Sequence, residues 1–299
     1  MICCENVLIT LHKQGYGARA WVPYFRNIQK VYKFVGLIII IAIMALRKTA
    51  NPALNRNTFM DFSLPAEGQA MTIQGTVNKV FLMTALLLAG AVYTWKIYYD
   101  AFSVQPETAA RAVSPWLLGG TVGGLITAII TIFRKTWSPY TAPIYAVLEG
   151  LVLGGISSVA ESSYPGIVIQ AIVITFGVLI SLLLAYKSRL IKPTENFRLG
   201  VAAATGGVFF LYLITFILNL FGIPVGYLHN GSPFAILINV AVVIIAALNL
   251  VLDFDFIEQG AEHGAPRYME WYAAFGLMVT LIWLYIEVLR LLAQTRSNR

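Results

Sequence analysis

Seven apolar stretches of about 20 residues follow one another along this chain, and each is long enough to cross the ~30 Å core of a bilayer as an α-helix. Backbone exposed to lipid must form its hydrogen bonds internally, and barrel strands need only about 10 residues, so runs of this length favour helices. The chain is therefore predicted to be all-α, a polytopic membrane helix bundle of about seven transmembrane helices. The runs are Val80–Tyr99, Trp116–Phe133, Tyr140–Ala160, Ile167–Tyr186, Leu199–Phe221, Phe234–Leu252 and Trp271–Leu292.

The composition agrees with a membrane protein. Of the 299 residues 58% are hydrophobic and 12% are charged, and the mean hydropathy is +0.74. A soluble domain of this size needs a more polar surface. The net charge of +7 comes from basic residues scattered singly or in pairs. They form no stripe that could follow a nucleic acid, so the expected partner is the lipid bilayer.

The distribution of Lys and Arg predicts the orientation of the bundle, because basic loops stay in the cytoplasm. One side carries eleven such residues, namely Arg47, Lys48, Arg56, Lys79, Arg134, Lys135, Lys187, Arg189, Lys192, Arg198 and Arg267. The other side carries five, namely Lys96, Arg111, Arg290, Arg296 and Arg299. This bias predicts an N-terminus in the cytoplasm and a C-terminus outside. The basic C-terminus also leaves open a half-inserted last helix that returns to the cytoplasm.

The N-terminal region divides into two parts before the transmembrane domain at 77–295. Residues 1–43 form an extension. The apolar run Phe34–Leu46, which begins in this extension and continues just past it, is short for a span. Three interpretations stay open for it: translation that starts at Met44, an interfacial or eighth helix, and a signal sequence. Residues 44–76 are polar and are predicted to be a cytoplasmic tail.

Cysteine and histidine residues favour neither a metal site nor an enzyme. Cys3 and Cys4 are adjacent and are the only two cysteines, so no disulfide framework exists. His12, His229 and His263 lie far apart, and no pair has the spacing of zinc ligands. No arrangement of Ser with His, or Cys with His, is visible either. We expect no catalytic residue and no bound cofactor.

Small residues recur at four-residue spacing in two of the runs, as Gly119 with Gly123, Gly120 with Gly124, and Gly150 with Gly154. In apolar helices this spacing lets backbones approach one another closely. The pattern predicts close helix neighbours for the second and third runs.

Ionisable residues inside apolar runs are the sharper functional signal, because a carboxylate in hydrocarbon costs several kcal/mol. Glu149 lies midway along the third run, and Asp253 and Asp255 close the sixth. Glu287 precedes Arg290 by three residues on the same face of the seventh run. Each of these carboxylates is expected to face a partner, a cavity or an ion path.

Three motifs in order resemble the Bax inhibitor-1 family, in its bacterial YccA-like branch. They are Pro143-Ile-Tyr-Ala-Val-Leu-Glu-Gly150, Leu252-Asp-Phe-Asp-Phe-Ile-Glu-Gln259 and Leu284-Tyr-Ile-Glu-Val-Leu-Arg-Leu-Leu292. The resemblance covers roughly residues 44–295. It implies a seven-helix bundle with helix 7 at the centre, in the bacterial inner membrane.

The resemblance also implies a pH-sensitive leak of Ca²⁺. In several relatives an Asp at the end of helix 6 pairs with an Asp in helix 7, and the shared proton opens or closes the pore, since two adjacent carboxylates cannot both ionise cheaply. The first Asp matches Asp253, but the second falls on Thr280, which cannot share a titrating proton. Substitutes within the chain are Asp255, Glu258, Glu287 and Glu149.

The preferred function is thus a pH-sensitive, channel-like cation leak, with Ca²⁺ as the transported ion, because hard cations prefer carboxylate and carbonyl oxygens. Asp253, Asp255, Glu149, Glu287 and Thr280 are the candidate residues of the ion pathway or its gate. The alternative is a non-transporting regulator that binds and restrains a membrane-bound protease through the cytoplasmic tail, as some bacterial relatives do.

Overall fold

The structure, a computed structural model, describes residues 70–221 and 232–297. In these ranges the regular structure is helical apart from one isolated bridge between Ala70 and Pro266. The extension 1–43, the Met44 start, most of the predicted tail and both cysteines lie outside the described residues and stay predictions.

Seven helices within the described ranges are long and apolar enough to cross a membrane, which confirms the predicted fold. They are α3 (Ile73–Val104), α4 (Ala109–Phe133), α5 (Ser138–Ser163), α6 (Ile167–Lys187), α7 (Glu195–Leu220), α8 (Pro233–Glu262) and α9 (Met269–Ser297). The short 3₁₀ helices η3 (Pro106–Thr108) and η4 (Lys135–Trp137) connect α3 to α4 and α4 to α5.

Most of these helices extend beyond the apolar runs that predicted them. The largest difference at a single helix end is in α8, which continues to Glu262, ten residues past Leu252. Asp253 and Asp255 therefore lie inside a helix and do not close it, contrary to the prediction. The backbone continues because the polar turns after Leu252 still pack against neighbouring helices, so hydropathy alone placed the helix end too early.

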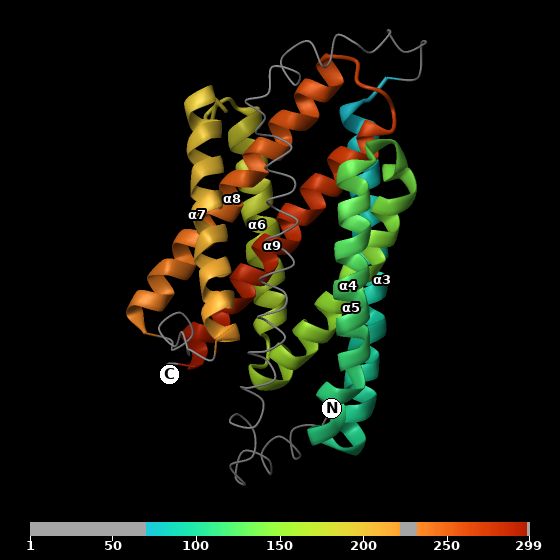
Figure 1. Cartoon of the computed structure of the whole chain (residues 1–299), viewed down its shortest axis with the longest axis vertical. Coiled ribbons are helices and arrows are strands. Elements are labelled where there is room, and N and C mark those ends of the chain that lie inside the picture. Colours follow the sequence, from blue (N-terminus) through green and yellow to red (C-terminus); the bar gives the residue numbers. More distant parts are fainter. Residues whose placement is uncertain (1–69, 222–231, 298–299) are drawn as a thin grey trace.

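The helices form two groups with α9 between them. In Figure 1, α3, α4 and α5 stand together on one side, while α6, α7 and α8 stand on the other. Helix α9 packs against α3, α5, α6 and α8, and nearly all of its side chains from residue 271 to residue 290 are buried. The seventh transmembrane helix is thus central, and it runs the length of the bundle instead of turning back halfway.

Glycines bring the backbones of α3 and α5 into contact. A Cβ atom added to Gly150 would lie 2.1 Å from the carbonyl oxygen of Leu87, and one added to Gly154 would lie 2.1 Å from that of Ala91. Of the predicted pairs on α4, Gly120 and Gly124 face α5, whereas Gly119 has nothing within 4 Å. This glycine-packed group of α3, α4 and α5 is the tightly joined half of the bundle.

Candidate functional site

A stripe of polar residues follows the buried face of α8. Asn239, Asn249 and Asp253 are all buried, and with Val242 and Ala246 they recur at spacings of three and four residues. That spacing keeps all five on one side of a helix. Asn249 donates hydrogen bonds to the hydroxyl of Thr205 on α7, at 2.8 Å, and to the carbonyl of Ile245, at 2.8 Å.

A matching stripe lies on α9. Thr280, Glu287 and Gln294 are buried and separated by seven residues each, which is two helical turns, so they share one face. The two stripes meet where the side-chain amide of Asn239 donates a hydrogen bond to Gln294. We call the residues of these stripes, with their partners on α7, the polar seam.

The contact between Asn239 and Gln294 sets the register of the seam. Helices α8 and α9 are antiparallel and pack along their length. From this contact, Asp253 and Thr280 each lie fourteen residues further on, or about 21 Å at 1.5 Å per residue. Asp253 therefore lies at the level of Thr280, and Ala246 lies at the level of Glu287.

This register bears on the carboxylate pair that the family resemblance implies. Asp253 is only 2% exposed. The register places it at the level of Thr280, the position to which the family resemblance assigns the second Asp. The hydroxyl of Thr280 donates a hydrogen bond to the carbonyl of Gly276, at 3.3 Å, and supplies no acidic proton. Among the described residues of the seam, Asp253 is the one carboxylate at this level, where the family resemblance implies two.

Glu287 forms the strongest polar cluster in the seam. Its carboxylate accepts hydrogen bonds from Arg290 at 2.5 Å, from the hydroxyl of Tyr212 on α7 at 3.0 Å, and from the indole of Trp283 at 3.3 Å. Arg290 also donates to the Tyr212 hydroxyl at 2.9 Å. We call Glu287, Arg290 and Tyr212 the ion-pair network. The predicted shared face of Glu287 and Arg290 is confirmed, but the charge count placed Arg290 with the C-terminal charges, whereas the structure buries it at 3% exposure within α9.

Asp255 and Glu258 lie near the end of α8, away from α9; Asp255 is half-buried against α7, and Glu258 is exposed. Asp255 forms an ion pair with Arg198 of α7, with 2.7 Å between the charged atoms, and accepts from Gln259 at 3.0 Å. Glu258 accepts a hydrogen bond from the hydroxyl of Tyr186 on α6. These contacts tie α6, α7 and α8 together at one end of the bundle. Neither residue supplies a second carboxylate at the level of Thr280.

Glu149 is also separate from the seam. It is fully buried between α5 and α4, where Gly124 leaves space for its carboxylate: a Cβ there would lie 2.8 Å from Oε1. Its carboxylate accepts a hydrogen bond from Tyr145 of the same helix. The predicted burial is confirmed, but Glu149 belongs to the glycine-packed half of the bundle.

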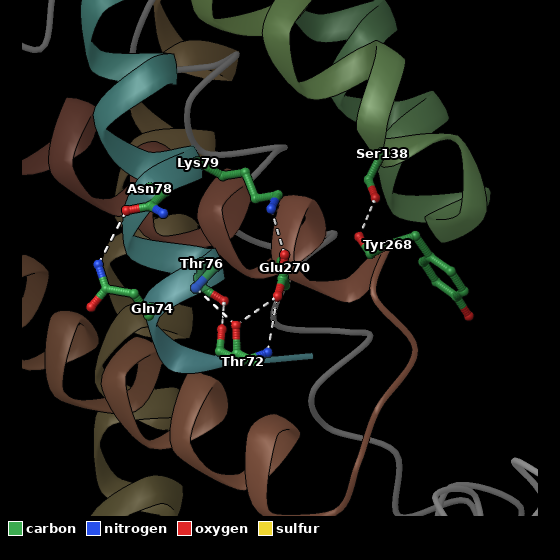
Figure 2. Close-up of polar contacts among 9 residues, drawn as sticks. Thr72, Gln74, Thr76, Asn78, Lys79, Ser138, Tyr268 and Glu270 are labelled. Atoms are coloured by element: carbon green, nitrogen blue, oxygen red, sulfur yellow. Dashed lines mark hydrogen bonds and ion pairs between the residues drawn. The ribbon is translucent and has the colours of Figure 1, made fainter. Parts of the chain in front are cut away.

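A second buried ion pair was not predicted. Figure 2 shows Glu270, in the first turn of α9, accepting hydrogen bonds from Lys79 at 2.5 Å and from the amide and hydroxyl of Thr72 at 3.0 and 2.9 Å. Gly75 makes room, since a Cβ there would lie 2.1 Å from Oε1 of Glu270. This cluster fastens the start of α3 to the start of α9.

Other seam residues escaped the sequence analysis, which looked mainly at ionisable groups. Asn239, Asn249 and Tyr212 are uncharged polar residues inside apolar runs, and Gln294 lies two residues beyond the last run. For Gln294 the sequence did hold a signal, because it follows Thr280 and Glu287 at the same seven-residue spacing. Among the residues that the structure describes, no group of three or more His, Cys, Asp and Glu side chains could hold a metal ion.

A known protein family matches this chain. The family model described as Bax inhibitor 1 like matches residues 51–297, which include every helix described above. No curated protein and no solved structure matches the chain.

Proposed function

The chain belongs to the Bax inhibitor 1 like family of multi-pass membrane proteins, and on that premise we propose that it is a channel-like cation leak protein whose transported ion is Ca²⁺. We place it in the YccA-like branch and in the bacterial inner membrane, with the lipid bilayer as its solvent. The proposal is for a transport protein without catalytic residues or a bound cofactor.

The observation that carries the proposal is the polar seam. An apolar core is sufficient to pack helices in lipid, and polar side chains at membrane depth are costly unless they are partnered. Here Asn239, Asn249, Asp253, Thr280 and Gln294 are buried along both sides of the α8–α9 contact. Buried carboxylate, amide and hydroxyl oxygens at successive levels are of the kind that hard cations take as ligands in proteins.

Asp253 is the centre of the proposed path. It supplies the carboxylate of the seam at the level of Thr280 and is almost fully buried on the central pair of helices. A fixed negative charge there attracts cations and excludes anions. We therefore assign Asp253 the role of cation binding within the path.

The pH response follows from Thr280. Two carboxylates at one level cannot both be charged cheaply, so a pair switches its charge as pH changes, whereas a lone carboxylate lacks that neighbour. We propose that the flux of this protein depends weakly on pH near neutrality, and that the pH sensitivity expected of the family returns when the second Asp is restored.

The test is Ca²⁺ flux into liposomes between about pH 5 and 8, for the parent, Asp253→Asn and Thr280→Asp. We expect the loss of most flux in Asp253→Asn and a steep pH response in Thr280→Asp. The matched control is Asp100→Asn, which removes an exposed carboxylate at the far end of α3 and should leave the flux unchanged.

Two outcomes would contradict these assignments. Unchanged flux in Asp253→Asn would remove that residue from the path. Absence of flux in the parent would refute the leak function and favour the alternative, a regulator that restrains a membrane-bound protease. That alternative would then be tested by co-purification of such a protease with the full chain.

A further inference from the structure

The ion-pair network lies deep in the bundle, between α7 and α9. Glu287 is 1% exposed and Arg290 is 3% exposed. Helix α7 packs mainly on α8, and Tyr212 reaches Glu287 and Arg290 through its side chain. Charged and hydroxyl groups thus fill the space between α7 and α9.

The network continues the seam toward the outer end of the bundle. Glu287 is seven residues, or about 10 Å, further along α9 than Thr280, and Gln294 follows after the same interval. An ion that passes Asp253 and Thr280 along this face must next pass Glu287. Ala246 is the residue of α8 at this level, and it is fully buried. Because its side chain is a single methyl group, α8 places no large side chain opposite the network.

The charges of the network cancel. Glu287 and Arg290 carry one charge of each sign, with 2.5 Å between their atoms, and Tyr212 is a neutral donor and acceptor for both. A helix that needed only mechanical attachment to α7 could use uncharged amides, as α8 and α9 do through Asn239 and Gln294. Moreover, Nε of Arg290 finds no hydrogen-bond acceptor among the described residues, so the guanidinium is not fully used as a structural donor.

We propose that the ion-pair network closes the outer part of the ion path and sets its charge balance, with Glu287 favouring a passing cation and Arg290 opposing it. This inference rests on the proposed leak function. The network then belongs to the path but has a role distinct from that of Asp253. Glu287 and Arg290 have opposite effects on cation flux.

The first test uses the opposite charges of Glu287 and Arg290. Glu287→Gln leaves a lone guanidinium and should lower cation flux about tenfold, while Arg290→Gln leaves a lone carboxylate and should raise it about tenfold, because a buried charge is poorly screened. The ratio of cation to anion permeability, taken from reversal potentials, should shift in the same directions. Arg290→Lys keeps the charge and should restore the parent's ratio.

A purely structural role predicts something different. Breaking a buried pair destabilises the fold whichever partner is removed. If both single variants change flux in the same direction, or leave the permeability ratio unchanged, the inference is refuted although the leak function stands. If the parent carries no flux, the leak function itself fails and the inference with it.

A second test keeps both charges in place. Ala246→Cys puts a thiol opposite Glu287, and Ag⁺, a small thiol-binding cation, should abolish its flux if ions pass this level. The matched control is Ala128→Cys on α4. Ala128 is equally buried but lies in the glycine-packed group of α3, α4 and α5. Block of both variants or of neither would overturn the placement of the network in the path.

Discussion

The contact between α3 and α5 makes a sharp prediction about Gly150. A Cβ atom at this position would lie 2.1 Å from the carbonyl oxygen of Leu87, whereas real Cβ contacts essentially never fall below 3.0 Å. Gly150→Ala therefore requires the two helices to part by about 0.9 Å. The obstructing atoms belong to helix backbone, which cannot rotate away as a flexible side chain could.

The expected cost follows from this displacement. Overpacking a close-packed interior typically costs about 1–3 kcal/mol. Because α3 and α5 share the most extensive helix contact in the bundle, a shift here loosens many neighbours at once, and we expect the upper end of that range, about 3 kcal/mol.

The free energy of unfolding can be measured by titrating SDS into protein held in mild detergent micelles, with tryptophan fluorescence as the signal. Gly119→Ala is the matched control: it adds the same methyl group on α4 with nothing within 4 Å. Since Ala is also the better helix former, this variant should lie within about 0.5 kcal/mol of the parent or be slightly more stable. Equal stability of the two variants would refute the backbone-to-backbone packing of α3 on α5.

Two further predictions concern other parts of the bundle. Lys79→Met should lower the free energy of unfolding by about 1–3 kcal/mol, because it leaves the buried Glu270 carboxylate without its cation, and a double-mutant cycle with Glu270→Gln should show strong coupling. Additive effects would argue against the ion pair. For topology, cysteines at Ser188 and Ser297 should be labelled from opposite sides of the membrane, and labelling of both from the same side would contradict seven spans.

The helices of this protein could be predicted from the sequence because membrane insertion is decided locally. Each span is recognised from its own hydrophobicity and length, with no knowledge of its neighbours. The same reasoning identified Glu149, Asp253 and Glu287 as buried carboxylates, since the cost of an exposed charge in lipid depends on depth and not on topology. The family motifs aligned Thr280 with the partner position of Asp253, and this pairing stays a prediction.

Only the tertiary structure decided which polar groups from distant parts of the chain meet. Tyr212 lies 75 residues before Glu287, and Thr72 lies 198 residues before Glu270, so neither contact has a local signature. Likewise, three glycine pairs with the same spacing proved unequal: Gly150 touches a backbone, while Gly119 faces open space. The reason is that hydrophobicity determines whether a helix enters the membrane, whereas its rotation and register against other helices depend on side-chain packing between distant segments, and these determine what each polar residue contacts.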